Sequence, residues 1–363
     1  MIRVLHLLDH DADFETRRGA QGIAGAAGEG FQIATRTIGS GGDWRDVATA
    51  AAMLRRSGDR FDVMHAWGGR ALAVATLAAR GRILFSPTSS TRGRTVRWLR
   101  AILAYRSVDV VCPTATMRRR LVQHGIPLDR CHLIRPGVDF SRVRKRRDTA
   151  LRSELGFTDG DVVYLAAGES TREAAHFDAV WATGILHVAE PRYKLLLWGR
   201  GEMTNSLARV PGRWRMPDLL RDAESKLGGR VEFEELLPAC DAMLVTARGP
   251  ISTLPVAMGM AAGVPAVAQV SYTVGELLED RHTALMVQAG KPRMLARRML
   301  DLEEDPTLRW SIADMARTEA YEFFAFTRFV NQFRQVYRQI AANGPVQVPE
   351  ESPGAGLRFH GRA

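Results

Sequence analysis

The segment "CDAMLVTARGPISTLPVAMGMAAGVPAVAQ", from Cys240 to Gln269, combines a predicted strand, loop and helix with very few charged side chains. Asp241 is its only acid, the next carboxylate is Glu276, and Arg248 is the only full charge between them. Any chemistry at this loop must therefore use hydroxyls, backbone amides and one guanidinium.

The start of the predicted helix supplies that chemistry. Ser252 or Thr253 can cap the helix, and Pro255 suits its first turn. Backbone amides and the helix dipole form an anion site without side-chain charge, with a dipole contribution of about 0.3–1 kcal/mol. The loop therefore predicts weak phosphate binding.

A second group of polar residues, Asp9, Asp11 and Asp13, follows the first predicted strand. Dehalogenase-type phosphatases and metal-dependent glycosyltransferases both place paired aspartates in such a loop. The phosphatase pattern needs Thr or Val at position 13, and no downstream Lys and paired-Asp set is evident. We interpret the aspartates as a solvated loop, and a role at the mouth of a cleft stays open because parallel sheets bind ligands where strands end.

His65, in "MHAWGG", either donates to a hydroxyl on the acceptor side of a site or is a packed structural residue. The nine histidines show no paired spacing typical of zinc, so no metal is expected. No G-x-G-x-x-G follows the first strand, which disfavours a dinucleotide oxidoreductase.

Short apolar strands alternating with helical patterns position these residues. Such alternation indicates crossover units and a parallel sheet. The predicted strands span 2–8, 31–38, 61–67, 82–87, 109–114 and 131–137 in the first half, and 161–168, 193–199, 230–235, 242–247 and 265–269 in the second. The predicted helices span 46–58, 71–80, 95–107, 115–125, 175–189 and 254–263.

The chain is long enough for two domains. The charged segment "RVRKRRDTALRSE" is the best boundary, so we predict domains at 1–148 and 149–317, a closing helix at 318–341 and a disordered tail at 342–363. The closing helix carries one apolar stripe, formed by Phe326, Phe329, Val330, Phe333, Val336, Tyr337 and Ile340. Two doubly wound domains predict a ligand cleft where their strand ends meet.

Composition indicates a soluble globular protein, with 46% hydrophobic and 25% charged residues. No apolar run reaches the length of a spanning helix, and "MIRVLHLLDH" is typical of a first strand rather than a signal peptide. Three separated cysteines favour reduced thiols in the cytoplasm. The net charge of +10 favours anionic partners or simply reflects arginine usage.

The segment "STRGRTVRWLRAILAYRS" surrounds Trp98 and Tyr105 with arginines at positions 92, 94, 97, 100 and 106. This pattern is typical of a helix lying on an anionic membrane, or of a core helix with an arginine-coated outer face. A peripheral contact with the inner membrane surface is the corresponding expectation. No nucleic-acid-binding motif accompanies the basic residues.

Two stretches resemble the retaining GT-B-fold glycosyltransferases of the "group 1" family. One is "DVVCPTATMRRRLVQHGIPLDRCHLIRPGVDFSRV", which closes on Gly137, Val138 and Asp139. The other is "CDAMLVTARGPISTLPVAMGMAAGVPAVAQVSYTVGELLEDRHTALMV", in which Ala262 to Pro265 and Glu276 match the family in order and spacing. The ending, residues 303–340, is also similar. The resemblance implies an α/β GT-B fold: two Rossmann-like domains facing a cleft, with the last helix crossing back to the first domain.

The sequence departs from the family at its charged positions. Where the family has two glutamates, for the donor sugar and the ribose, this chain has Pro250 and Met258, which lack carboxylate acceptors. Where the family has an Arg and a Lys for the donor diphosphate, it has Glu169 and Ala174. A lost charge-assisted hydrogen bond costs about 1.5–3 kcal/mol, more than the helix dipole supplies. Thr88 stands where the family often has a His.

The resemblance therefore implies one of two functions. The first is transfer of a sugar from a nucleotide-sugar donor to an unknown glycan, lipid or small-molecule acceptor with retention, without a cofactor. The second is a catalytically impaired relative that binds a ligand or a partner protein. The candidate donor-site residues are Gly168, Arg172, Arg200, Arg248, Ser252, Thr253 and Glu276, and His65 is the acceptor-side candidate.

Overall fold

The structure is a computed structural model that describes residues 1–39, 44–78, 81–88, 93–143 and 147–342. The chain forms two compact units, one made of Met1–Gly137 with the chain from Phe326 onward, the other of Val138–Ala325. Residues 343–363, predicted as a disordered tail, lie outside the described residues.

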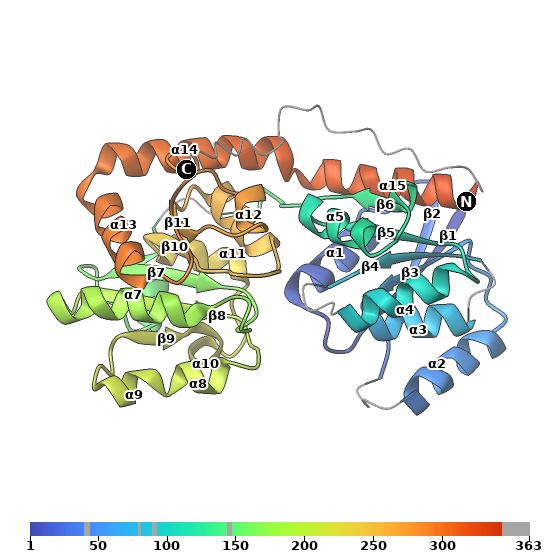
Figure 1. Cartoon of the computed structure of the whole chain (residues 1–363), viewed down its shortest axis with the longest axis horizontal. Coiled ribbons are helices and arrows are strands. Elements are labelled where there is room, and N and C mark those ends of the chain that lie inside the picture. The colour runs from blue at the N-terminus through green and yellow to red at the C-terminus, as the bar shows by residue number, and fades with distance from the viewer. Residues whose placement is uncertain (40–43, 79–80, 89–92, 144–146, 343–363) are drawn as a thin grey trace. The chain divides into compact units, whose positions relative to one another are not determined.

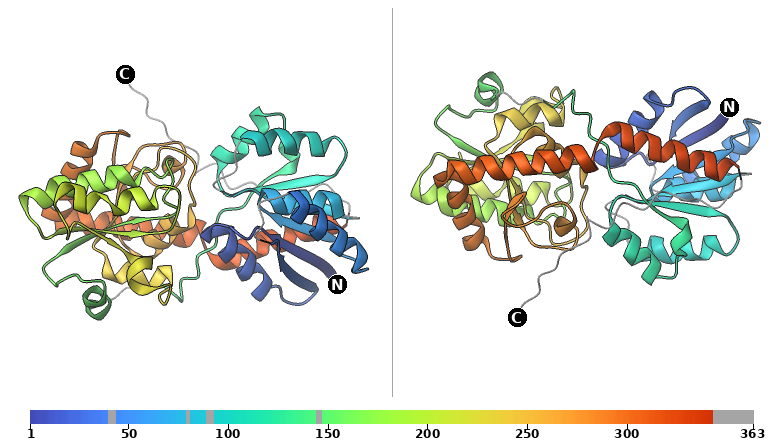
Figure 2. Two further views of the ribbon diagram at one scale, coloured as in Figure 1. Left: turned by 90° about the horizontal axis from the view of Figure 1, so that it is seen from below. Right: turned by 90° about the horizontal axis from the view of Figure 1, so that it is seen from above.

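Unit 1 contains a six-stranded parallel sheet of order β2-β1-β3-β4-β5-β6. Helices cover both faces of the sheet, as Figures 1 and 2 show. Its strands are β1 (Ile2–Leu8), β2 (Phe31–Thr37), β3 (Val63–Trp67), β4 (Arg82–Ser86), β5 (Val108–Cys112) and β6 (Cys131–Leu133). Its helices are α1 (Phe14–Gly25), α2 (Trp44–Arg56), α3 (Gly69–Ala78), α4 (Gly93–Leu103), α5 (Ala115–Gln123) and α15 (Phe326–Ala341), with a short turn η1 (Leu128–Arg130).

Unit 2 contains a second six-stranded parallel sheet, of order β12-β11-β10-β7-β8-β9. Its strands are β7 (Val162–Ala167), β8 (Tyr193–Trp198), β9 (Leu220–Asp222), β10 (Ala242–Val245), β11 (Ala266–Gln269) and β12 (Ala284–Val287). Its helices are α6 (Thr149–Glu154), α7 (His176–Ala189), α8 (Thr204–Ala208), α9 (Val210–Trp214), α10 (Ala223–Leu227), α11 (Phe233–Leu236), α12 (Leu254–Ala262), α13 (Pro292–Glu304) and α14 (Pro306–Phe323), with turns η2 (Leu237–Ala239) and η3 (Val274–Glu276). The predicted pair of Rossmann-like domains is confirmed.

The closing helix packs on unit 1 through its predicted apolar stripe. Phe329, Val330, Phe333, Val336, Tyr337 and Ile340 are buried in one core cluster with residues of β1 and β3. Phe326, the first member of the stripe, is only partly buried. Burying a large apolar side chain contributes about 1.5–3 kcal/mol, so this stripe anchors α15 (red in Figure 1) to the first sheet.

The single closing helix predicted at 318–341 is two helices, α14 and α15. The chain breaks at Phe324 and Ala325, because the Phe324 carbonyl accepts from the Val138 amide at 2.7 Å and Ala325 forms an isolated bridge with Val138. The predicted domain boundary between 148 and 149 falls inside unit 2. The backbone amide of Asp148 donates to Pro238, which ties this segment to the second unit.

Several predicted elements in the chain differ from the observed ones. The strand predicted at 230–235 is wrong: Glu232 and Glu235 form a reciprocal capping box that starts α11. Helix α1 and the short strands β9 and β12 were not predicted. Strands of three or four residues carry too little periodicity to be recognised against their surroundings.

Candidate functional site

A small pocket lies at the carboxyl ends of β7 and β10 in unit 2. These strands are neighbours in the sheet, although the chain leaves β7 toward β8 and returns to β10 on the other side. Open parallel sheets bind ligands at such a reversal of strand order. The lining residues are Ala167, Gly168, Glu169, Ala174, His176, Met243, Leu244, Val245, Thr246, Ala247, Ile251 and Val256.

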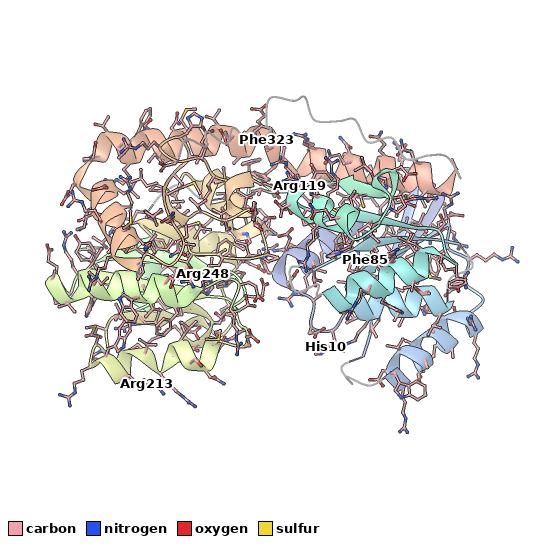
Figure 3. All side chains as sticks on the ribbon, viewed as in Figure 1. His10, Phe85, Arg119, Arg213, Arg248 and Phe323 are labelled. Atoms are coloured by element: carbon pink, nitrogen blue, oxygen red, sulfur yellow. The ribbon has the colours of Figure 1, made fainter. Side chains whose placement is uncertain are left out.

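Hydrogen bonds hold the two loops of this pocket together. The buried Thr246 hydroxyl donates to the Ala174 carbonyl at 2.9 Å, and the Arg248 amide donates to the Glu173 carbonyl at 2.8 Å. The Arg248 guanidinium also pairs with Asp178 on α7, with Nε–Oδ2 at 3.1 Å, and lies beside that helix in Figure 3. The pocket rim is therefore built before any ligand arrives.

Gly168 provides an open stretch of backbone at the pocket. Its φ of 109° lies in a region that favours glycine, and a Cβ placed there would meet no atom within 4 Å. The predicted candidate Gly168 therefore lies where a ligand can approach the main chain closely.

Gln269, at the end of β11, is a buried polar residue that sequence reasoning missed. Val245 pairs in register with Ala268, so the next residues, Thr246 and Gln269, are neighbours on one face of the sheet. The Gln269 side chain is fully buried, and neither amide atom has a hydrogen-bond partner among the described residues. An unsatisfied buried amide costs about 1–3 kcal/mol, and Gln269 itself is not among the residues that line the pocket.

His176 was also missed, and it lines the pocket at the first position of α7. Burial lowers the pKa of His176 to about 4, so its ring is neutral at pH 7. Its Nδ1 lies 3.4 Å from the Ser170 hydroxyl, which itself donates to the Gly199 carbonyl at 2.9 Å. A lone histidine in a helical pattern carries no sequence signal that separates a pocket residue from a packed one.

The structure separates the three arginine candidates. The Arg172 side chain is 82% exposed, and its Nε lies 3.8 Å from Glu202. Arg200 is held on the start of α10, where it contacts Glu224 at 2.8 Å, Ser225 at 3.0 Å and Asp222 at 3.4 Å. Arg248 is half exposed beside Asp178. Arg172 is therefore the guanidinium that can reorient toward an anion at the lowest cost.

The loop before α12 departs from the predicted capping. Thr253 takes the N-cap position without a side-chain cap hydrogen bond, Pro255 lies in the first turn, and Ser252 and Thr253 are both buried. Met258 is buried within α12. This helix is apolar on every face, and such a helix is buried in the core. Glu276 ends the short turn η3 and is partly buried.

His65 in unit 1 belongs to a buried network rather than an open site. Its Nδ1 lies 2.7 Å from the Tyr337 hydroxyl and its Nε2 lies 2.8 Å from the Ser86 hydroxyl. His6 Nε2 lies 2.9 Å from the same Tyr337 hydroxyl, and both rings are fully buried. The structure thus favours the packed alternative for His65, because both ring nitrogens are already engaged.

Two of the three aspartates after β1 cap helices, and the third, Asp11, pairs with Arg70 at 3.4 Å. Asp9 accepts from the amides of Arg70 and Ala71 at the start of α3, and Asp13 accepts from Thr16 at the start of α1. Gly68 has a φ of 109°, and a Cβ there would overlap the Asp9 carboxylate, so this position favours glycine. No cluster of His, Cys, Asp and Glu among the described residues could hold a metal ion.

Comparisons with known proteins follow the same division into two units. The Glycosyltransferase Family 4 model matches residues 2–142, and the Glycosyl transferases group 1 model matches residues 163–305. Together the two models support a group 1 glycosyltransferase of the GT-B fold. The pocket described above lies in the group 1 domain.

Individual relatives agree with the family. The chain is 24% identical over 228 residues to N-acetyl-alpha-D-glucosaminyl L-malate synthase of Bacillus anthracis. The aligned region covers 60% of this chain and 58% of that relative. Among solved structures, Anabaena HepE with UDP and glucose superimposes with a TM-score of 0.78 at 17% identity, covering 93% of this chain and 100% of that chain. Sucrose-phosphate synthase of Thermosynechococcus elongatus gives a TM-score of 0.76 at 14% identity, covering 95% and 100%.

Among the residues that the structure describes, no helix is both long and apolar enough to cross a bilayer.

Proposed function

We propose that this protein transfers a sugar from a nucleotide-sugar donor to an acceptor, with retention of the anomeric configuration. The observation that carries the proposal is the pocket at the reversal of strand order in the group 1 domain. There, open backbone at Gly168 follows β7, and the buried Thr246 follows β10 at the same edge of the sheet.

The proposed donor is a UDP-sugar. HepE has been solved with UDP and with UDP-glucose, and the Bacillus anthracis relative is named for transfer of N-acetylglucosamine to L-malate. UDP-glucose and UDP-N-acetylglucosamine are therefore the first donors to test, and L-malate is one of the acceptors to include.

The proposed diphosphate contacts are Arg172 and backbone amides rather than a buried pair of cations. Arg172 is exposed and only loosely paired, whereas Arg200 would have to leave Asp222 and Glu224. Leaving-group stabilisation is the largest electrostatic term in glycosyl transfer from a nucleotide diphosphate, so one guanidinium in place of two cations predicts a slow enzyme.

The rival function is binding without transfer. Pro250 and Met258 stand where the resemblance places glutamates, and the Met258 side chain is buried within α12. The pocket lining retains one carboxylate, Glu169, and can hold a nucleotide while lacking the two glutamates that position the donor sugar in the resemblance. This observation favours a ligand-binding module if turnover is absent.

Calorimetric titration with UDP tests the donor site. We expect binding in the wild type, affinity about 10- to 100-fold weaker in Arg172→Gln, because a charge-assisted hydrogen bond is lost, and affinity within about twofold in the matched control Arg200→Gln. Absence of a heat signal with UDP, GDP and ADP would refute the transferase proposal.

Product analysis separates the two functions. Incubation with UDP-glucose or UDP-N-acetylglucosamine, followed by proton NMR of the first-formed product, gives both the turnover and the anomeric configuration. Nucleotide binding without turnover for any acceptor would support the binding module. An inverted product would refute retention.

A further inference from the structure

Three aromatic side chains form an exposed cluster on the outer surface of unit 2. Phe177 and Trp181 lie one helical turn apart on α7, and Trp214 ends α9. The ring centroids are 6.2 Å apart for Phe177–Trp181, 6.1 Å for Phe177–Trp214 and 5.6 Å for Trp181–Trp214. Phe177 is 39% exposed and Trp181 is 47% exposed.

The cluster is held in place by the packing beneath it. A Cβ on Gly184 of α7 would meet the Trp214 ring at 2.9 Å, so the indole lies directly against the helix backbone. The buried residues of α7, among them Val180, Ala182 and Leu186, face the core. A fixed, half-exposed aromatic surface loses little conformational entropy when it binds a partner.

Arginines without ion-pair partners among the described residues lie at one side of this cluster, next to Trp214 in and around α9. Arg209, Arg213 and Arg215 flank or lie within α9, are exposed, and have no ion pair among the described residues. Arg213 lies on α9 at the outer edge of the unit (Figure 3). Nearby arginines differ, because Arg192, Arg200 and Arg221 all pair with carboxylates.

The neighbouring acids do not offset this positive charge. Asp178, next to Phe177 in α7, pairs with Arg248, and Asp218, after α9, pairs with Arg221. The group formed by Phe177, Trp181, Trp214, Arg209, Arg213 and Arg215, which we name the aromatic–arginine patch, is therefore apolar at its centre and positively charged at one side.

We propose that the aromatic–arginine patch binds the surface of an anionic lipid membrane. Trp and Phe rings insert favourably at the level of lipid headgroups, and arginines bind headgroup phosphates, each cation contributing roughly a fivefold gain in affinity near an anionic surface. The negative charge of such a membrane complements the positive charge of the patch. A second copy of this chain is a poorer partner, because both its patch and its net charge of +10 are positive.

The membrane surface would then lie next to the candidate site. Phe177 directly follows His176, which lines the pocket, so patch and pocket share the first turn of α7. The inference does not depend on the proposed transfer reaction, because vesicle binding can be measured without a donor.

Sedimentation with vesicles tests the proposal. The full chain is mixed with vesicles of phosphatidylcholine alone, or of equal parts phosphatidylcholine and phosphatidylglycerol, at low and high salt. We expect binding to the mixed vesicles only, weakened by salt. Replacing all three arginines of the patch with Gln is expected to weaken binding about 100-fold, and Phe177→Ser with Trp181→Ser about 10-fold.

Two control variants make the result specific. Arg309→Gln with Trp310→Ser removes an exposed arginine and tryptophan from α14, on the opposite side of unit 2 in Figure 1, and should leave binding unchanged. Arg97→Gln with Arg100→Gln tests the basic helix α4. Circular dichroism and melting curves confirm that each variant is folded.

Three results would overturn the proposal. The first is unchanged vesicle binding by folded patch variants. The second is loss of binding in the α4 variant alone, which would assign the membrane contact to unit 1. The third is a wild-type dimer that the patch variants convert to a monomer without any vesicle binding, which would assign the patch to a second copy of the chain.

Discussion

The hydroxyl of Tyr337 fastens the closing helix to the first sheet, and its removal gives the sharpest test of the structure. The hydroxyl lies 2.9 Å from His6 Nε2 on β1 and 2.7 Å from His65 Nδ1 on β3. Tyr337, His6 and His65 are all fully buried, and Trp67 stacks on the His65 ring at 4.1 Å. Tyr337→Phe keeps the aromatic ring and removes only the oxygen.

The expected cost follows from the two hydrogen bonds. Burial lowers the pKa of both histidines, so both rings are neutral and the hydroxyl donates to one nitrogen and accepts from the other. Without it, one nitrogen on each ring loses its partner in a dry core. Each unsatisfied buried group costs about 1–3 kcal/mol, so two such groups are expected to lower the free energy of unfolding of unit 1 by about 2–6 kcal/mol.

Equilibrium urea unfolding followed by circular dichroism measures this loss. Native-state hydrogen exchange adds a local readout, because amides of α15 should exchange at least about 30-fold faster when the helix is held less tightly. The matched control is Tyr105→Phe in the same unit, where the side chain is 88% exposed and the change should stay within about 0.5 kcal/mol. A Tyr337→Phe variant as stable as Tyr105→Phe would refute the buried network.

Three further predictions concern pH, a buried cation and a close contact. Burial lowers the pKa of His6 to about 3, so between pH 6.5 and that value the unfolded chain binds a proton that the folded chain does not, and stability falls on acidification. Between pH 6.5 and 5, the free energy of unfolding should fall with pH about 1.1 kcal/mol per pH unit less steeply in His6→Leu than in the wild type, and equal slopes would contradict the reasoning. The buried Arg152 donates to three backbone carbonyls and to Asp241. Arg152→Ala should therefore lower the free energy of unfolding in urea by about 3–5 kcal/mol, against about 0–1 kcal/mol for Arg147→Ala, where the side chain is half exposed. Similar losses in the two variants would contradict the burial of Arg152. Gly68 has a φ of 109° and leaves no room for a Cβ beside Asp9, so Gly68→Ala should lower the melting temperature by several degrees, whereas an unchanged value would show that the Asp9 contact is dispensable.

Arg152 also explains the role of the one acid in the segment from Cys240 to Gln269. Asp241, its only carboxylate, lies before β10, at the opposite end of the strand from the pocket. There it accepts from the Val163 amide at 2.8 Å and pairs with Arg147 and Arg152. The acid therefore stabilises the sheet of unit 2 and has no place in the candidate chemistry.

The periodicity of the sequence was sufficient to predict the parallel architecture, because hydrophobic runs of strand length alternate with helical patterns through most of both halves. The apolar stripe of α15 was predicted for the same local reason. Short elements such as β9 and α11 were not, since three or four residues depend on their neighbours and on capping rather than on a repeat.

The sequence by itself determined the class of fold, the family resemblance and the poverty of charge around the predicted donor loop, because these depend on residue type and order along the chain. Only the tertiary structure decided which polar groups are available. It enclosed His65 between Tyr337 and Ser86, tied Arg200 to the start of α10, and gave the amide of Gln269 no hydrogen-bond partner among the described residues. Availability depends on contacts between residues far apart in the chain, and no local pattern encodes those contacts.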